Sequence, residues 1–120
     1  MTAWFKQEAG GRITTPCLFL DGEVIELHLE NDTLSDRGAA YDAVRTQTAH
    51  CNFPSGFLNQ QATEISATLG VRYERGVFSK TGVTASNLET AILQMVNAML
   101  LFYGSMMGAC RISTYSQCEE

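Results

Sequence analysis

The chain has few basic residues. It carries 8 Lys and Arg against 13 Asp and Glu in 120 residues, for a formal net charge of −5. Proteins that hold nucleic acid without regard to sequence neutralise its phosphates with a cationic surface. We therefore do not expect nucleic acid as a partner. The negative charge favours solubility or attraction to a basic protein surface, and the absence of a dense acidic run argues against mimicry of nucleic acid.

The sequence predicts neither a leader segment nor a catalytic motif. Residues 1–10 include Lys6 and Glu8 and contain no long apolar run, so they do not match a secretory leader, and we expect a cytoplasmic protein. The sequence has no nucleophile elbow, no phosphate-binding glycine loop and no HExxH zinc helix. We therefore favour a protein without enzymatic activity.

The cysteines show no metal-binding pattern. Cys17, Cys51, Cys110 and Cys118 lack CxxC spacing, and His50 beside Cys51 is only a pair of neighbours. We accordingly predict no metal site and no cofactor. In a cytoplasm we expect all four thiols to stay reduced. If the C-terminal tail were oxidised, Cys110 and Cys118 are the pair that we expect to join.

The composition is that of a globular chain, with 45% apolar and 18% charged residues. A chain of this length suits one domain with a real core. The sequence contains no internal repeat, low-complexity tract or linker. We predict a single domain over residues 1–120, with a polar tail at 109–120 that frays.

The longest periodic apolar segment runs from Ser86 to Tyr103. Large apolar residues recur there at three- and four-residue steps, as on one face of a helix: Leu88, Ile92, Met95, Val96, Met99 and Leu100. Ser86 and Glu89 have the spacing of a capping box, and Gly104 supplies a left-handed stop. This pattern predicts the main helix of the core.

Two alternatives for that helix remain open. A membrane span needs about 20 apolar residues, and the run after Glu89 has no charge before Arg111, but Gln94 and Asn97 interrupt it. We favour a core helix and expect no membrane contact. The residues off the main stripe, Leu93, Leu101 and Phe102, offer a second apolar face through which a homodimer would form.

Two strands are predicted near the N-terminus, at 12–20 and 23–30, joined by the hairpin turn Asp21-Gly22. The second strand alternates between an apolar face and a polar face, typical of a sheet with one side on the core: Ile25, Leu27 and Leu29 against Glu26, His28 and Glu30. A two-residue loop pairs Leu18 with Ile25. It places Pro16, which has no amide hydrogen to donate, at an edge or a bulge.

The remaining elements complete an α+β order. We predict a short helix at 2–9, whose Trp4 and Phe5 either dock on the body or belong to an interface. After a turn at 31–32 we predict a strand at 33–35, a helix at 39–46, a second helix that Ser55 caps and that runs through Leu69 to a stop at Gly70, and a hairpin at 71–80. This order predicts a small antiparallel sheet built from hairpins, with helices packed on one face.

Several of these segments match a known pattern. The chain reads Ile-Thr-Thr-Pro at 13–16, Leu-Ser-Asp-Arg-Gly at 34–38 and Leu-Gly-Val at 69–71. In this order they resemble the bacterial and phage family known as domain of unknown function 1828, which has Ile-Thr-Thr-Pro-Phe and Leu-Thr-Asp-Asp-Gly. The resemblance implies an α+β fold in a bacterial or mobile-element genome and no reaction. Cys17 replaces the Phe, and Arg37 replaces the second Asp, which weakens any metal site there.

The candidate interaction surface joins the polar strand face to the loop after the third strand: Glu26, His28, Glu30, Asp36 and Arg37. Neighbours on one strand face lie about 7 Å apart, so the three strand residues alone cannot surround one metal ion. Asp36 joins them only if the third strand pairs beside the second. The alternative for Asp36 is a structural cap on the following helix, with Gly38 at positive φ.

The leading hypothesis is a small non-enzymatic protein-interaction domain of bacterial or phage origin, which binds and modulates a host or defence protein. One alternative is a metal-dependent hydrolase or nuclease that uses Glu26, His28, Glu30 and Asp36. Another is a nucleic-acid-binding regulator, for which a basic hairpin is the candidate contact: Arg72, Arg75 and Lys80. Homodimerisation is compatible with all three.

Overall fold

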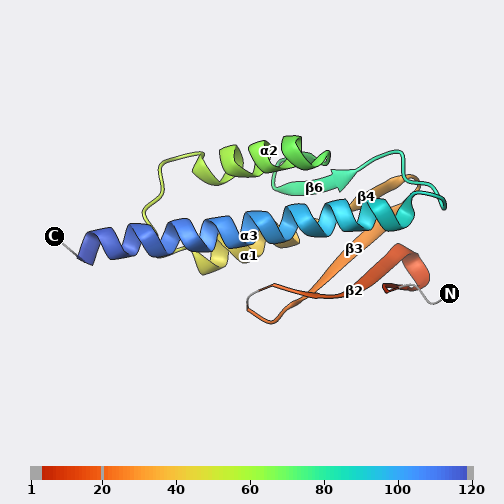
Figure 1. Ribbon diagram of the computed structural model, residues 1–120, viewed down its shortest axis with the longest axis horizontal. Coiled ribbons are helices and arrows are strands. Elements are labelled where there is room, and N and C mark those ends of the chain that lie inside the picture. The colour runs from red at the N-terminus through yellow and green to blue at the C-terminus, as the bar shows by residue number, and fades with distance from the viewer. Residues whose placement is uncertain (1–3, 20, 119–120) are drawn as a thin grey trace.

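The structure is a computed structural model that describes residues 4–19 and 21–118, with side chains as far as Cys110. Within these residues, six strands form one antiparallel sheet in the order β1-β2-β3-β4-β6-β5, and three helices pack with it (Figure 1). The strands are β1 (Lys6–Gln7), β2 (Arg12–Leu18), β3 (Val24–Glu30), β4 (Thr33–Ser35), β5 (Arg72–Glu74) and β6 (Val77–Lys80). The helices are α1 (Ala39–Gln47), α2 (Phe57–Leu69) and α3 (Leu88–Cys118). The predicted α+β class is confirmed.

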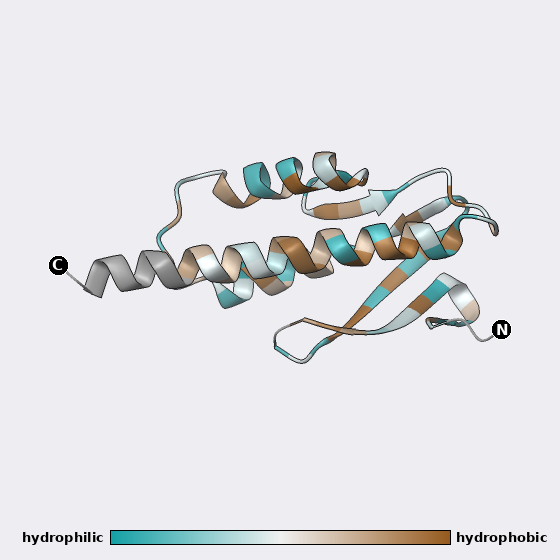
Figure 2. Ribbon diagram, viewed as in Figure 1, coloured by the Kyte–Doolittle hydropathy of each residue, from teal (hydrophilic) through white to brown (hydrophobic). Residues whose placement is uncertain are grey.

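The alternation along β3 sets the two faces of the sheet, and it is visible as alternating bands in Figure 2. Ile25 and Leu27 are fully buried, whereas Glu26 and His28 on the opposite face are half-buried. One hydrophobic cluster joins these strand residues to buried residues of α1, α2 and α3. The face that carries Ile25 and Leu27 is called the inner face below, and the opposite one the outer face.

Helix α3 runs along the whole body, packs against α1, α2 and β6, and extends past them at its C-terminal end (Figure 1). Ile92, Met95 and Met99 are fully buried, as predicted. The expected stop at Gly104 is wrong, because the helix continues to Cys118. Met106, which is also buried, carries the core stripe past the glycine, and this packing outweighs a glycine cost of about 1 kcal/mol.

The second apolar face of α3 is narrower than predicted. Leu93 and Leu101 are exposed, but Phe102 is fully buried in the core. The segment Leu88–Cys110 is long and apolar enough to cross a membrane by length and composition alone. Half of its most apolar stretch is buried inside the protein, as expected for a core helix.

The predicted capping box at the start of α3 does not form. Ser86 Oγ instead shares a hydrogen bond of 2.9 Å with Thr84 Oγ1. Glu89 accepts a hydrogen bond of 3.2 Å from the indole N–H of Trp4. Asn87, directly before the helix, accepts from the backbone N–H of Thr84 at 2.7 Å. The N-terminal segment therefore takes the carboxylate that the capping box required.

That N-terminal segment is a strand and not the predicted helix. β1 pairs with β2, with Lys6 opposite Thr14. An extended segment satisfies the backbone groups along the edge of β2, which a helix would leave to solvent. Trp4 and Phe5 pack against the core, so docking on the body is confirmed. Thr2 and Ala3 lie outside the described residues.

The β2–β3 hairpin has a different register from the one predicted. Leu18 pairs with Val24 and not with Ile25, and Thr14 pairs with Glu26. The register shifts between Thr14 and Leu18, which marks the irregularity expected at Pro16. The hydroxyl of Thr15 donates a hydrogen bond of 2.9 Å to the Ile25 carbonyl there.

The other turns agree with the predictions in part. Helix α2 begins after Gly56, in the left-handed region at φ 79°, and not after Ser55. Gly70, at φ 73°, ends α2 as predicted, because the next amide donates back to the Ser66 carbonyl at 3.0 Å. The β5–β6 hairpin turns at Arg75-Gly76, where both residues have positive φ, as in a type I′ turn.

Candidate functional site

The outer face brings most of the predicted surface residues together. β4 pairs beside β3, so Ser35 lies opposite His28 and Thr33 lies opposite Glu30. A hollow of about 370 Å³ lies over this part of the sheet and is lined by His28, Glu30 and Arg37 among others. The pairing of the third strand beside the second, which the sequence alone did not decide, is therefore present.

A larger open groove of about 640 Å³ lies next to that hollow, between the β2–β3 turn and the start of α1. Most of its walls are charged, and we call it the acidic groove: Asp21, Glu23, Val24, Glu26, His28, Arg37 and Asp42. The sequence predicted Glu26, His28 and Arg37. It missed Asp21, Glu23 and Asp42, because they join the groove only through the fold of the hairpin toward α1.

Asp36 lies beneath the groove and is only 1% exposed. The prediction that it belongs to an accessible interaction surface is therefore wrong. Its Oδ1 accepts hydrogen bonds from the amides of Gly38 at 2.8 Å and Phe78 at 3.0 Å. Its Oδ2 accepts from the amide of Ala40 at 3.2 Å. The alternative role as a structural cap is confirmed: the carboxylate fastens the start of α1 to β6.

Burial dominates the protonation of Asp36. Its removal from water raises the pKa of the carboxyl, and the hydrogen bonds from Gly38, Ala40 and Phe78 oppose that rise only in part. The site therefore holds a carboxylate at some energetic cost. Because both oxygens already accept backbone hydrogens, the group is committed to the fold.

His28 lies between charges of both signs on the outer face. Burial, followed by the positive charge of Arg37, lowers the pKa of its imidazole, while Glu26 has the opposite effect. The lowered pKa favours the neutral form of the His28 imidazole. The side chain of Arg37 is exposed, and its backbone N–H donates to Ser35 Oγ at 3.0 Å.

The acidic groove ends at an apolar pair on the hairpin. Leu18 and Val24 lie directly opposite each other on neighbouring strands. Leu18 is 52% exposed and Val24 is 46% exposed. Paired residues point to the same side of a sheet, so this apolar pair shares the outer face with Glu26 and His28. A surface of this kind combines apolar contact with surrounding charge.

The carboxylate metal site of the hydrolase hypothesis does not assemble. Glu26, His28 and Glu30 follow one another along β3, and Asp36 is engaged by backbone amides. Among the described residues, the one group of three or more His, Cys, Asp or Glu side chains whose ligand atoms converge lies elsewhere. It consists of His50, Cys51 and Cys110, whose ligand atoms lie within 4.8 Å of one another.

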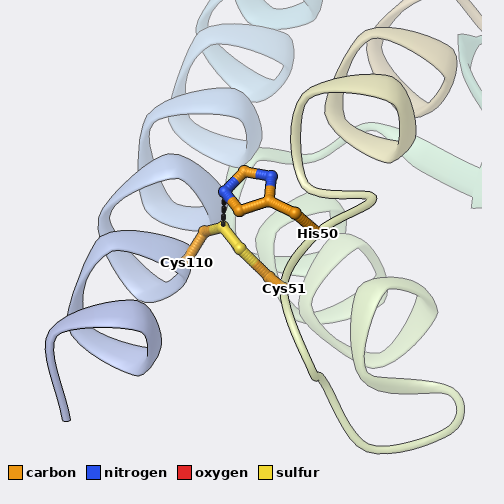
Figure 3. A group of neighbouring side chains, drawn as sticks. All are labelled: His50, Cys51 and Cys110. Carbon is orange, nitrogen blue, oxygen red and sulfur yellow. Dashed lines mark hydrogen bonds between the residues drawn. A yellow bond between two sulfur atoms is a disulfide. The ribbon is translucent and has the colours of Figure 1, made fainter. Parts of the chain in front are cut away.

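This second cluster corrects the cysteine predictions. Cys51 and Cys110 form a disulfide, with their Cα atoms 5.6 Å apart, so these two thiols are not reduced (Figure 3). His50 Nε2 lies 3.7 Å from Cys110 Sγ. Cys17 is a free thiol. The predicted Cys110–Cys118 pair is wrong, because Cys110 is bonded to Cys51. The side chain of Cys118 lies outside the described part of the chain.

In the basic hairpin, two of the three basic side chains already have partners within the protein. Arg72 forms an ion pair of 2.9 Å with Glu74, and Lys80 Nζ donates to the Gly70 carbonyl at 2.8 Å. Arg75 lies at the tip of the turn. The nearby hydroxyl of Tyr73 donates a hydrogen bond of 2.6 Å to Asn59 Oδ1 of α2. Arg72, Tyr73 and Lys80 therefore take part in contacts within the fold.

Comparisons with known proteins find no counterpart for this chain. No protein family matches it, and neither does a curated protein or a solved structure. The resemblance to domain of unknown function 1828 stays a prediction.

Proposed function

We propose that this chain is a protein-interaction domain that receives a basic segment of a partner protein in the acidic groove. The observation that carries the proposal is the concentration of charge there. Asp21, Glu23 and Asp42 are exposed around the groove, and Glu26 is half-buried in its wall. Arg37 is the one Lys or Arg among the lining residues.

The apolar pair supplies the second part of the surface. Interfaces gain most of their binding energy from a few well-packed residues that are fully removed from water, while surrounding charges guide the approach. Leu18 and Val24 stand at the end of the groove, where a partner's apolar side chain would cover them. A partner segment with Lys or Arg residues beside an apolar anchor fits both parts.

The setting of this interaction belongs to the same proposal. The resemblance to domain of unknown function 1828 supports a bacterial, phage or mobile-element origin, and a host or defence component as the partner that is bound and modulated. We propose a cytoplasmic location, where cellular reductants would convert part of the Cys51–Cys110 disulfide to two thiols. The proposal assigns no reaction to the groove.

The test is affinity capture from a bacterial lysate treated with nuclease. Glu23→Lys reverses a charge in the groove, and Glu64→Lys makes the same change on an exposed position of α2. We expect a protein partner that survives nuclease, binds roughly tenfold less well to Glu23→Lys, and binds Glu64→Lys like the original chain. Binding should also weaken as salt rises, because exposed charges are screened.

Two results would overturn the proposal. If both variants capture the partner equally well, then the groove is not its site. If capture depends on nucleic acid and is lost with Arg75→Glu, the regulator hypothesis replaces it.

A further inference from the structure

The cluster of His50, Cys51 and Cys110 is a second site, separate from the acidic groove. His50 and Cys51 lie in the connection between α1 and α2, and Cys110 lies on α3, 59 residues from Cys51 (Figure 3). The three side chains turn toward one point. Cys110 is 5% exposed, Cys51 is half-buried and His50 is exposed, so the site lies at the protein surface with a buried floor.

We propose that the reduced chain binds one zinc-class divalent cation through His50 Nε2 and the sulfur atoms of Cys51 and Cys110. The disulfide is then the oxidised, metal-free state of the same site. The proposal is independent of the acidic groove and its partner.

The spacing of the donor atoms fits a tetrahedral ion. Zinc lies about 2.3 Å from sulfur and about 2.0 Å from imidazole nitrogen, which places these two donors about 3.5 Å apart in a tetrahedron. His50 Nε2 and Cys110 Sγ are 3.7 Å apart. The same geometry separates two sulfur ligands by about 3.8 Å. Because sulfur atoms in a disulfide lie about 2.05 Å apart, reduction must let them part by almost 2 Å.

The donor chemistry selects the class of metal. Two thiolates and one imidazole suit zinc and related borderline or soft ions, whereas magnesium and calcium prefer oxygen ligands. Three protein ligands leave a fourth position for water or for a ligand from a partner. A groove of about 220 Å³ lies on the Cys51 side of the cluster and is also lined by Phe53 and Phe57. His50 is exposed, so the cluster is open to solvent on its side.

The change between the two states balances with a thiol reductant. A protein dithiol donates two electrons and two protons to the Cys51–Cys110 bond, which becomes two thiols while the reductant becomes a disulfide. Binding of the cation then releases the two thiol protons. Oxidation by a disulfide through thiol exchange restores the bond and expels the ion.

Both states keep α3 tied to the α1–α2 connection. The disulfide does so by a covalent bond, and the metal would do so through ligands from the same two segments. The chain that is reduced and also stripped of metal is therefore the state with the loosest attachment at this end of α3.

The test uses Co²⁺ as a spectroscopic probe on the full chain, reduced with a phosphine and freed of metal. We expect thiolate-to-cobalt charge-transfer absorbance in the near ultraviolet that saturates at one equivalent and is displaced by Zn²⁺. Zn²⁺ should also raise the thermal unfolding midpoint of the reduced chain. The oxidised chain should show neither effect.

Variants separate the site from other thiols. Cys51→Ser and Cys110→Ser should abolish the charge-transfer absorbance, and His50→Ala, at an exposed position, should weaken Co²⁺ binding at least tenfold without loss of the fold. Cys17→Ser is the matched control and should bind as the original chain does. The proposal fails if the reduced chain gives no such absorbance, or if His50→Ala binds Co²⁺ unchanged.

Discussion

The inner and outer faces of the sheet are built from the same strands, yet the inner face forms the core and the outer face forms the acidic groove. On the inner face Ile25 and Leu27 are fully buried. One residue away along β3, Glu26 and His28 line the acidic groove. Because side chains alternate along a strand, one segment provides both core and candidate binding surface. Substitutions should therefore separate cleanly into effects on stability and effects on binding.

The largest expected effect comes from the inner face. Phe78 is fully buried, with its ring centroid 5.6 Å from that of Phe102. Phe78→Ala should lower the free energy of unfolding by about 4 kcal/mol, since it removes the buried ring and leaves a cavity. Denaturant unfolding measures the change. Val24→Ala on the outer face should cost less than about 1 kcal/mol, and an equal loss for both would break the comparison.

The second-largest expected effect is that of the disulfide, which attaches α3 to the α1–α2 connection in addition to its packing on the inner face. The Cys51–Cys110 bond closes a loop between residues that are 59 positions apart in the sequence. Its reduction should lower the free energy of unfolding by about 2–4 kcal/mol, because the unfolded chain regains the freedom that the loop removes. Unfolding curves with and without a phosphine reductant measure this loss in metal-free protein. Cys17→Ser should leave the difference intact, and no change on reduction would contradict the prediction.

Asp36 is a buried carboxylate, and its removal should lower the free energy of unfolding by less than reduction of the disulfide does. Asp36→Ala leaves the amides of Gly38, Ala40 and Phe78 without their acceptor, which should cost about 2 kcal/mol. The cost of burying the carboxylate, which disappears with it, limits the loss. Asp32→Ala removes an exposed carboxylate before β4 and should be nearly neutral in the same unfolding experiment. Equal stability for Asp36→Ala and the original chain would rule out the cap.

The smallest effect concerns pH on the outer face. Folding lowers the pKa of His28 below its ordinary 6.5, so the unfolded chain takes up the proton more readily than the folded chain. The stability that neutral His28 contributes is present above pH 6.5 and is lost as the pH falls through its folded pKa. We expect His28→Gln to lose slightly less stability than the original chain on acidification. An NMR titration that places the His28 pKa above 6.5 would contradict this.

Local patterns in the sequence predicted much of the fold. Alternation at 24–30 identified both faces of β3, and the helical period identified Ile92, Met95 and Met99 as core. Gly70 ended α2 as expected, because its left-handed conformation closes a helix through a backbone hydrogen bond. These features depend on neighbours in the chain, so the chain itself reveals them.

Features set by distant contacts were not predictable. The helix passes Gly104 because Met106 and Cys110 continue to pack beyond it. The β2–β3 register depends on an irregularity next to Pro16 that strand alternation does not reveal. The Cys51–Cys110 bond joins residues 59 positions apart, and no spacing rule links them. Asp42 was missed as part of the acidic groove for the same reason, since it meets the hairpin only in the folded chain.

The central claim is that the outer face is the binding face. Its most direct test is a titration of the isotope-labelled chain with a Lys- and Arg-rich peptide at low salt, followed by backbone amide NMR. The account predicts that the largest shifts cluster at Val24, Glu26, His28 and Arg37, and that Glu23→Lys needs roughly tenfold more peptide to reach the same shifts. Shifts spread evenly over the surface, or centred on the β5–β6 hairpin, would contradict it.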